Sequence, residues 1–202
     1  HLNAETGETV AAAMKWGPLT VGEVLAGFGD STAWLIAAAF IIADGFVLTG
    51  LGRRIALGFL ARFGKTPLGL AYGLGAADLV VSPGTPSLTA RYGGVVYPLV
   101  RSISKEQGSE PFDESRKKLG AYLTFTSVAV SSLTSALFLT AMAGNPLMAN
   151  AVRSMDLGFE ITWGNWFLAA VVPVAVGLVV IPWVAYRIFP PGIVETPEAP
   201  AA

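Results

Sequence analysis

The chain has 202 residues and a net charge of −1, and 53% of its residues are hydrophobic while only 13% are charged. Soluble domains carry about 25% charged residues, so this deficit indicates a chain surrounded largely by lipid. The near-neutral charge argues against a nucleic-acid-binding face. Cysteine is absent and His1 is the single histidine, which excludes disulfides, thiolate catalysis, imidazole metal clusters and catalytic triads from the body of the chain.

The N-terminal part predicts an extramembrane segment followed by a first membrane span. Residues 1–30 mix charged and small residues, which indicates an extramembrane stretch with one amphipathic helix. Residues 31–50 are apolar except for Asp44, and about 20 helical residues span the hydrocarbon core. Trp34 lies near the start of this run, where an interfacial aromatic residue is expected. The chain begins with histidine and lacks a signal-peptide pattern, so we expect a piece of a longer reading frame.

The next part of the chain predicts a re-entrant hairpin. Residues 51–65 form a basic amphipathic connector, and the apolar run 68–81 gives roughly 21 Å of helix, which is too short to span. The sequence SPGTP at 82–86 breaks that helix, and a second apolar stretch occupies 87–103. The loop 101–118 is again rich in lysine and arginine, so both flanks belong in the cytoplasm. The segment between them therefore enters and leaves on one side, with its tip facing a site rather than lipid.

Two further spans are predicted in the C-terminal part. Residues 119–142 are uncharged and long enough to cross, with a break at 143–146, and 166–189 form a last span that Pro173 and Pro182 are expected to kink. We thus predict an all-α membrane protein with three full transmembrane helices and one re-entrant hairpin. The expected divisions are 1–30, 31–66, 67–103, 104–118, 119–160, 161–189 and a Pro-rich linker at 190–202.

Hydroxyl-bearing residues gather at the predicted hairpin tip. Ser82, Thr85, Ser87 and Thr89 surround the start of its second half. The free N–H groups and dipole of a helix N-terminus favour an anionic carboxylate, and the hydroxyls could also hold a cation. The competing interpretation is ordinary N-capping by serine or threonine.

Three charged residues lie within the predicted membrane segments. Arg91 follows Ser87 by one helical turn, and it could pair with a substrate, with Asp78 or with lipid phosphates. Intramembrane carboxylates are functional hypotheses by default, so Asp78 and Asp44 are candidates as well. For Asp44 the alternative is a structural hydrogen bond near the end of its span.

The second predicted break offers carbonyl groups. Asn145 and Pro146 would end the first half of a broken helix, and the carbonyls freed around residues 141–144 could coordinate a cation. The alternative is a plain helix end. Hydroxyls between 124 and 135 could line a polar path, or could bond back to their own helix. Gly69 and Gly73 form a small-residue packing motif.

These motifs, in this order, resemble the divalent anion:sodium symporter family. The resemblance is closest to its 2-oxoglutarate/malate translocator and citrate/succinate antiporter branch. It covers about residues 22 to 202 and is carried by SPGTPSLTARYGGVVYPLV at 82–100, TGLGRRIA at 49–56, SLTSALFLTAMAGNP at 132–146, and the terminal segments at 190–191 and 196–200.

The resemblance implies two inverted repeats, each with a hairpin whose tip carries a Ser-Asn-Thr motif that binds a substrate carboxylate. Ser87 and Thr89 match the first and third motif positions, while the central asparagine is Leu88 here. The implied substrate-binding residues are Ser87, Leu88, Thr89, Asn145 and Pro146. The implied sodium-binding residues, if transport is coupled, are Ser82, Thr85, Ser87, Ala143 and Gly144. Leu88 removes one polar contact, which favours exchange over strict symport.

The expected function is secondary transport of small dicarboxylates of the 2-oxoglutarate, malate or succinate type by an elevator-like mechanism. The alternatives are a carrier of sulfate or another divalent anion, and a non-transporting membrane scaffold or degenerate half-transporter. We expect no enzymatic activity, no cofactor apart from Na⁺, and no nucleic-acid partner. The expected partners are the dicarboxylate, the bilayer, a missing second half of the same polypeptide and a second copy in a homodimer. The expected location is the bacterial inner membrane.

Overall fold

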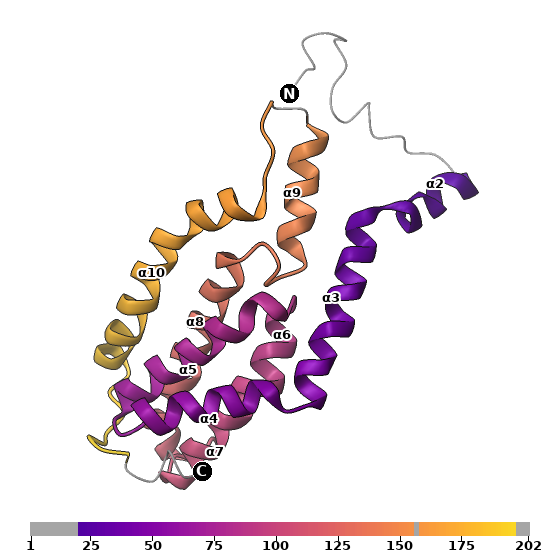
Figure 1. Ribbon diagram of the computed structural model, residues 1–202. Helices are drawn as coiled ribbons and strands as arrows, with labels where there is room; N and C mark the ends of the chain where they lie inside the picture. Colours follow the sequence, from indigo (N-terminus) through magenta and orange to yellow (C-terminus); the bar gives the residue numbers. More distant parts are fainter. Residues whose placement is uncertain (1–19, 156–157, 197–202) are drawn as a thin grey trace. The chain divides into compact units, whose positions relative to one another are not determined.

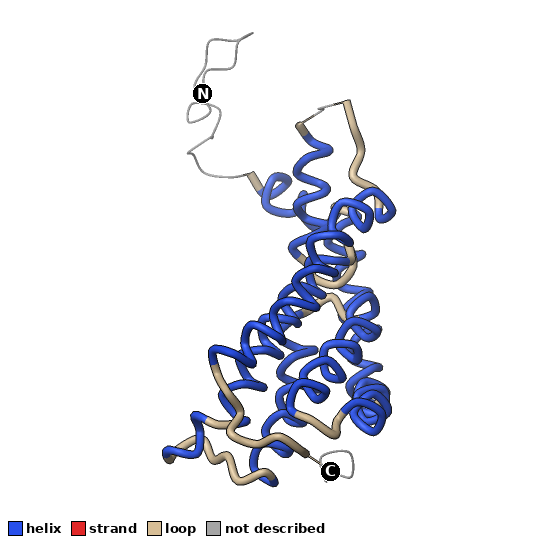
Figure 2. The backbone as a smooth tube through the Cα atoms, turned by 90° about the vertical axis from the view of Figure 1, so that its left-hand side faces the viewer, coloured by secondary structure: helices blue, strands red, loops and turns tan. Residues whose placement is uncertain are grey.

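The computed structural model describes residues 20–155 and 158–196, and all regular structure in these residues is helical (Figure 2). The first 19 residues of the predicted N-terminal segment and the last six of the predicted linker lie outside the described residues. The described chain divides at Trp34 into two units. The longer helices are α3 (Ser31–Leu48), α4 (Leu51–Phe63), α5 (Pro67–Val81), α7 (Tyr97–Glu106), α8 (Leu119–Leu137), α9 (Gly144–Ser154) and α10 (Trp163–Ile188), and the short ones are α2 (Val21–Leu25), η1 (Ala26–Gly29), η2 (Ser82–Gly84), α6 (Leu88–Arg91), the π-helical η3 (Tyr92–Val96) and η4 (Glu114–Lys117).

The first unit is short and locally ordered. It contains α2, η1 and the start of α3, and the indole Nε1 of Trp34 donates a 2.6 Å hydrogen bond to the carbonyl of Phe28. The helix predicted within residues 1–30 is represented here by α2 and η1.

The second unit is built on packing between α4, α5, α7, α8 and α10 (Figure 1). Its core is apolar and draws on all five helices, including Leu60 of α4, Leu74 of α5, Ile103 of α7, Leu123 of α8 and Ala185 of α10. Burying such side chains is the main favourable term that holds helices together. In a membrane, close packing and interhelical hydrogen bonds take over where lipid surrounds the helices.

Glycines allow α5 to approach its neighbours closely. A Cβ at Gly69 would lie 2.0 Å from the carbonyl oxygen of Phe63, and one at Gly73 would lie 3.4 Å from that of Phe59. On another face, a Cβ at Gly75 would lie 3.1 Å from Val130 of α8. Gly69 and Gly73 therefore form a packing motif against α4, as the sequence predicts.

The hairpin predicted at 67–103 begins and ends at the same end of the helices. Pro67 opens α5 after the N-cap Thr66, whose hydroxyl accepts a hydrogen bond from the N–H of Gly69 at 3.1 Å. Its second half runs on through α6, η3 and α7 to Glu106. The C-terminal tail contacts the chain on both sides of this hairpin. Before the hairpin, Thr196 donates to the carbonyls of Gly64 and Lys65 at 2.7 and 2.9 Å. After it, a Cβ at Gly192 would lie 3.6 Å from Lys118.

The predicted break between the two C-terminal spans is displaced. The helix ends at Leu137, the irregular segment occupies residues 138–143, and Gly144, Asn145 and Pro146 lie in the first turn of α9. Proline is well accommodated in a first helical turn, where its missing N–H has no helical partner to lose. The chain that follows Pro146 is therefore helical as far as Ser154.

Among the described residues, α10 is by itself long and apolar enough to cross a membrane. The stretches 33–46 and 51–63 pass the same criterion only as a pair, and they meet at an angle of 58°. The all-helical prediction is confirmed, while three spans and a re-entrant hairpin remain predictions. Pro173 and Pro182 lie inside the continuous α10.

Candidate functional site

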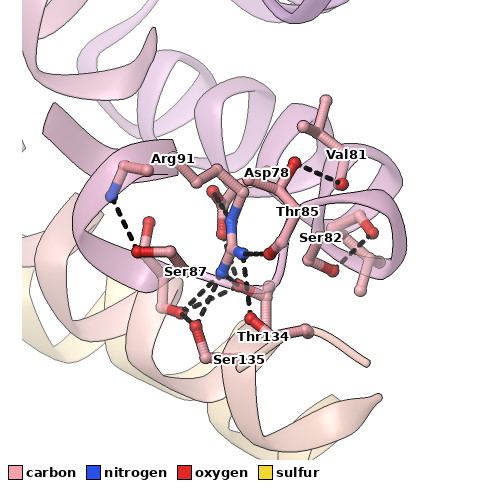
Figure 3. A network of polar contacts seen from close by, with 12 residues as sticks. Asp78, Val81, Ser82, Thr85, Ser87, Arg91, Thr134 and Ser135 are labelled. Atoms are coloured by element: carbon pink, nitrogen blue, oxygen red, sulfur yellow. Dashed lines mark hydrogen bonds and ion pairs between the residues drawn. The ribbon is translucent and has the colours of Figure 1, made fainter. Parts of the chain in front are cut away.

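The hairpin tip is a short irregular segment between α5 and α6. The chain leaves α5 through the 3₁₀ turn η2, becomes extended at Thr85, and re-enters a helix after Ser87. Ser87 is the N-cap of α6, and its Oγ accepts a hydrogen bond from the N–H of Ala90 at 3.2 Å (Figure 3). Two prolines and a glycine in six residues account for this geometry, since neither flanking helix can extend through them.

The irregular segment 138–143 packs directly against this tip. The hydroxyl of Thr140 donates to the carbonyl of Pro83 at 2.9 Å, and the N–H of Ala143 donates to the carbonyl of Pro86, also at 2.9 Å. These bonds satisfy the carbonyls of Pro83 and Pro86, which have no α-helical partner because the backbone of the tip is irregular. The structure thus brings together two breaks that are more than fifty residues apart in the chain.

Arg91 lies at the centre of this junction and is almost completely buried, with 1% of its surface exposed. Its Nε donates to a carboxylate oxygen of Asp78 at 2.7 Å (Figure 3). Its Nη1 donates to the carbonyls of Thr85 at 3.1 Å and Ala141 at 3.4 Å. One guanidinium therefore links α5, the tip and the irregular segment before α9.

The same side chain also reaches α8. Its Nη2 donates to the hydroxyl of Ser135 at 2.7 Å and, more weakly, to Thr134 Oγ1 and the Ser131 carbonyl, both at 3.3 Å. Thr134 Oγ1 in turn donates to the second carboxylate oxygen of Asp78. Figure 3 shows Asp78, Thr134 and Ser135 grouped around the guanidinium. We call Asp78, Arg91, Thr134 and Ser135 the arginine hub.

The hub decides between the alternatives that the sequence left open for Arg91. The arginine pairs with Asp78, and both side chains are 1% exposed, which leaves no face for a substrate or a lipid phosphate. The void beside them measures about 10 Å³, which is room for about one water molecule. Such a pair is tolerated in a low-dielectric interior because every donor has a partner and the charges offset each other.

The side chain of Asn145 caps the C-terminal end of α8. Its side-chain amide donates to the carbonyls of Ser135 at 2.8 Å and Phe138 at 3.0 Å, and the residue is buried. These are carbonyls that a helix C-terminus leaves without partners. Pro146 follows it in α9 and is half-buried.

The residues predicted to bind a cation cluster at the junction, but most of their polar atoms are engaged. Ser82 and Thr85 hydroxyls donate to carbonyls of their own helix, at Leu79 (3.0 Å) and Val81 (3.3 Å). The Ala143 N–H contacts the tip, and the carbonyl of Ala141 accepts from Arg91. Gly144 is exposed at the start of α9.

Of the five residues predicted to bind substrate, three lie at the hairpin tip, whereas Asn145 and Pro146 lie in α9. Thr89 is exposed, Leu88 and Ser87 are half-exposed, and all three lie at the start of the second helical half. Within the described residues, the side-chain hydroxyl of Thr89 makes no hydrogen bond, so it is open to a ligand. Asp44 lies apart from this group, exposed on α3, and α3 meets the tip through Phe46, whose ring would lie 3.0 Å from a Cβ at Gly84.

The hydroxyls between 124 and 135 differ in their partners, and among the described residues those of Thr126 and Ser131 are buried without a hydrogen bond. Ser127 and Ser132 bond back to carbonyls of their own helix at 2.6 and 2.9 Å, as the alternative interpretation held. Thr134 and Ser135 belong to the hub. The sequence offered Asp78 as one partner for Arg91, but it offered Thr134 and Ser135 only as part of a polar path or as back-bonded hydroxyls. The signal for their role is a pair of adjacent hydroxyls in a chain that carries an intramembrane charge pair.

The sequence of the chain is similar to a transporter family and to several named proteins. Residues 8–202 match the family described as "Sodium:sulfate symporter transmembrane region". The chain is 47% identical to the "Putative malate transporter YflS" of Bacillus subtilis, 44% to "Dicarboxylate transporter 1, chloroplastic" of Spinacia oleracea, and 44% to "Inner membrane protein YbhI" of Escherichia coli. These alignments cover 91%, 90% and 84% of the chain, but only 38%, 32% and 35% of the relatives, so the chain spans about a third of their length.

Proposed function

Because this chain belongs to the sodium:sulfate symporter family, as its resemblance to the divalent anion:sodium symporters predicted, we propose that it supplies one substrate-binding hairpin of a carrier for small dicarboxylates. Members of the family are integral membrane proteins. Two of the three relatives named above carry malate or dicarboxylate in their names, which favours these substrates over sulfate. Relatives in Bacillus subtilis and Escherichia coli favour the bacterial plasma membrane as the location.

The observation that carries this proposal is the open side of the hairpin tip. Ser87 and Thr89 place two hydroxyls at the N-terminal turn of a helical segment that continues to Glu106. The first amides of such a segment and its positive dipole end favour a carboxylate. Leu88 lies between the two hydroxyls and offers only apolar contact to the carbon backbone of the substrate. The second carboxylate would be held by residues outside this chain.

We propose that the tip moves as part of a rigid body during an elevator-like cycle. The arginine hub ties α5, the tip, α8 and the segment before α9 into one cluster of buried hydrogen bonds. If the tip opened by itself, Arg91 would lose some of its hydrogen bonds while the Asp78–Arg91 pair stayed largely buried, and an incompletely bonded buried charge is costly. Movement of the whole cluster keeps the pair intact.

We expect Thr89→Ala to reduce dicarboxylate uptake by about tenfold or more, because a hydrogen bond to a charged group contributes about 1.5–3 kcal/mol. The measurement is uptake of labelled malate into proteoliposomes that contain the full-length protein. Thr49→Ala is the matched control, since Thr49 is also exposed but bonds only to the carbonyl of Gly45 in its own helix. Unchanged uptake by the Thr89 variant, with normal folding, would mean that the tip is structural. Competition by sulfate would instead favour the inorganic anion.

We also propose exchange rather than strict sodium symport. The Arg91 guanidinium already bonds to carbonyls of Thr85 and Ala141, which belong to the two elements predicted to enclose a cation. We expect malate–malate exchange to change by less than about twofold when choline replaces sodium. The reason is that the guanidinium of Arg91 supplies a permanent positive charge where a bound sodium ion would otherwise be needed. If exchange is lost in choline and returns when sodium is added, the protein is a sodium symporter and this proposal is wrong.

A further inference from the structure

A polar groove lies where α7 ends and α8 begins, away from the tip of the hairpin. It has a volume of about 470 Å³ and is bounded by α7, the loop 109–112, η4 and the first turns of α8. No residue of the tip, of the arginine hub or of the predicted cation site lines it. The sequence analysis treated this loop only as a sign of the cytoplasmic side.

The groove is strongly basic. Four of the side chains that line it are cationic and one, Glu110, is acidic. Lys117 is paired with Glu114 at 2.7 Å, and Arg116 donates to the carbonyl of Asp113 at 3.2 Å. Within the described residues, the other two cationic side chains form no ion pair or hydrogen bond, and these are Arg101 and Lys105 on successive turns of α7. Arg101 and Lys105 are therefore the cations of the groove without a partner, and Glu110 is the one acidic side chain in its lining.

A buried polar group without a partner lies between these two cations. Ser104 is 5% exposed, lines the groove, and its Oγ makes no hydrogen bond. Thr126 and Ser131 are the other buried hydroxyls without a partner among the described residues, and of the three only Ser104 lines the groove, where a ligand can supply the missing hydrogen bond. A hydroxyl that can donate, flanked by an arginine and a lysine, is a suitable set of groups for a phosphate oxygen.

The loop that forms the far wall is already ordered. Ser109 Oγ donates to the carbonyl of Ser115 at 2.8 Å and accepts from the N–H of Gly120 at 3.0 Å. Ser115 Oγ accepts from the N–H of Glu110 at 2.8 Å, and hydrogen bonds from the side chain and N–H of Ser115 lower the pKa of Asp113. A wall that is ordered in advance reduces the entropy lost when a ligand binds.

The surroundings match a lipid rather than a soluble anion. Phe112 at the rim is 96% exposed, which places a bare aromatic ring beside basic residues, as in segments that rest in the headgroup region. From the cations the groove continues past Tyr97, Ala121 and Thr124 on the sides of α7 and α8. This leaves an uncharged path for acyl chains next to a site for a phosphate.

We propose that this groove binds the phosphate headgroup of an anionic glycerophospholipid from the cytoplasmic leaflet. Arg101 and Lys105 would contact the phosphate, Ser104 Oγ would donate to it, and Phe112 would enter the interface beside it. Basic grooves between membrane helices on this side of a bilayer suit such headgroups. The inference requires the membrane location of the family but not the dicarboxylate site.

The test is native mass spectrometry of the purified protein titrated with dioleoylphosphatidylglycerol or dioleoylphosphatidylcholine. We expect preferential binding of phosphatidylglycerol, reduced about 25-fold in Arg101→Gln/Lys105→Gln, at about fivefold for each basic residue near an anionic lipid. Ser104→Ala keeps the charges and should weaken binding about fivefold through loss of one hydrogen bond. Arg53→Gln/Arg62→Gln removes the same charge from exposed sites on α4 and should bind like the parent.

Equal binding of phosphatidylcholine, equal loss in the Arg53/Arg62 control, or unchanged binding in Ser104→Ala would each overturn the proposal. Displacement of phosphatidylglycerol by equimolar glycerol 3-phosphate would also overturn it, because the groove would then recognise a soluble phosphate ester. The assay involves no transport, so it remains decisive even if Thr89→Ala leaves uptake unchanged. If the double variant fails to fold, Ser104→Ala provides the decision.

Discussion

Arg91→Met is expected to lower the free energy of unfolding by about 3–5 kcal/mol, because it leaves the Asp78 carboxylate buried without its partner. Methionine can fill much of the space but cannot donate to Asp78, to Ser135 or to the carbonyls of Thr85 and Ala141. For a chain of this size the melting temperature should fall by about 10 °C. The measurement is thermal unfolding in detergent micelles, followed by tryptophan fluorescence.

Two controls separate the charge pair from general damage. Arg53→Met removes an exposed arginine from α4 and should change the free energy of unfolding by no more than about 0.5 kcal/mol. Asp78→Leu/Arg91→Met removes both charges and should recover part of the loss, since a buried pair can often be replaced by apolar residues at little cost. Recovery should be incomplete because the carbonyl of Thr85 stays buried without Arg91. A single Arg91→Met variant as stable as the parent would show that the hub contributes nothing to stability.

Gly69→Ala is expected to lower the free energy of unfolding by about 3 kcal/mol, the upper end for overpacking. A Cβ there would lie 2.0 Å from the carbonyl oxygen of Phe63 and 3.0 Å from Thr66 Oγ1. The first of these contacts is with the backbone, so no side-chain rotation can relieve it, and α4 and α5 would have to separate at their connection. The same unfolding measurement detects the change.

Gly58→Ala is the matched control for this variant. Gly58 lies in the middle of α4, and a Cβ there would meet nothing within 4 Å. Alanine favours a helix over glycine by about 1 kcal/mol, so this variant should be as stable as the parent or slightly more stable. If Gly69→Ala is as stable as Gly58→Ala, then α4 and α5 do not approach each other as closely at Gly69 as the structure indicates.

The positions of most helices could be predicted from local sequence. The apolar run at 31–50 became α3, the run at 68–81 became α5, and the two prolines around Gly84 ended one helix and delayed the next until Leu88. These predictions succeed because hydrophobic length and helix-breaking residues act on their immediate neighbours.

The second break shows where local reasoning fails. Gly144 and Pro146 predicted an irregular segment at 143–146, whereas α9 already begins at Gly144. The helix before it ends at Leu137 within the sequence Ala-Leu-Phe-Leu-Thr, which contains no breaker. Contacts with the tip through Thr140 and Ala143 stabilise the irregular backbone there. Such contacts come from residues about sixty positions away, so no local pattern reveals them.

By itself, the sequence determined that this is a helical membrane protein of the sodium:sulfate symporter family, because composition, apolar length and motif order are properties of the chain read in one dimension. It also supplied the hairpin tip residues that remain the proposed carboxylate site. Only the tertiary structure decided that Arg91 is a buried structural hub rather than a ligand for substrate. That decision depends on Asp78, Thr134 and Ser135 meeting around one guanidinium, and a side chain with five donors takes whichever acceptors the packing of helices brings within reach.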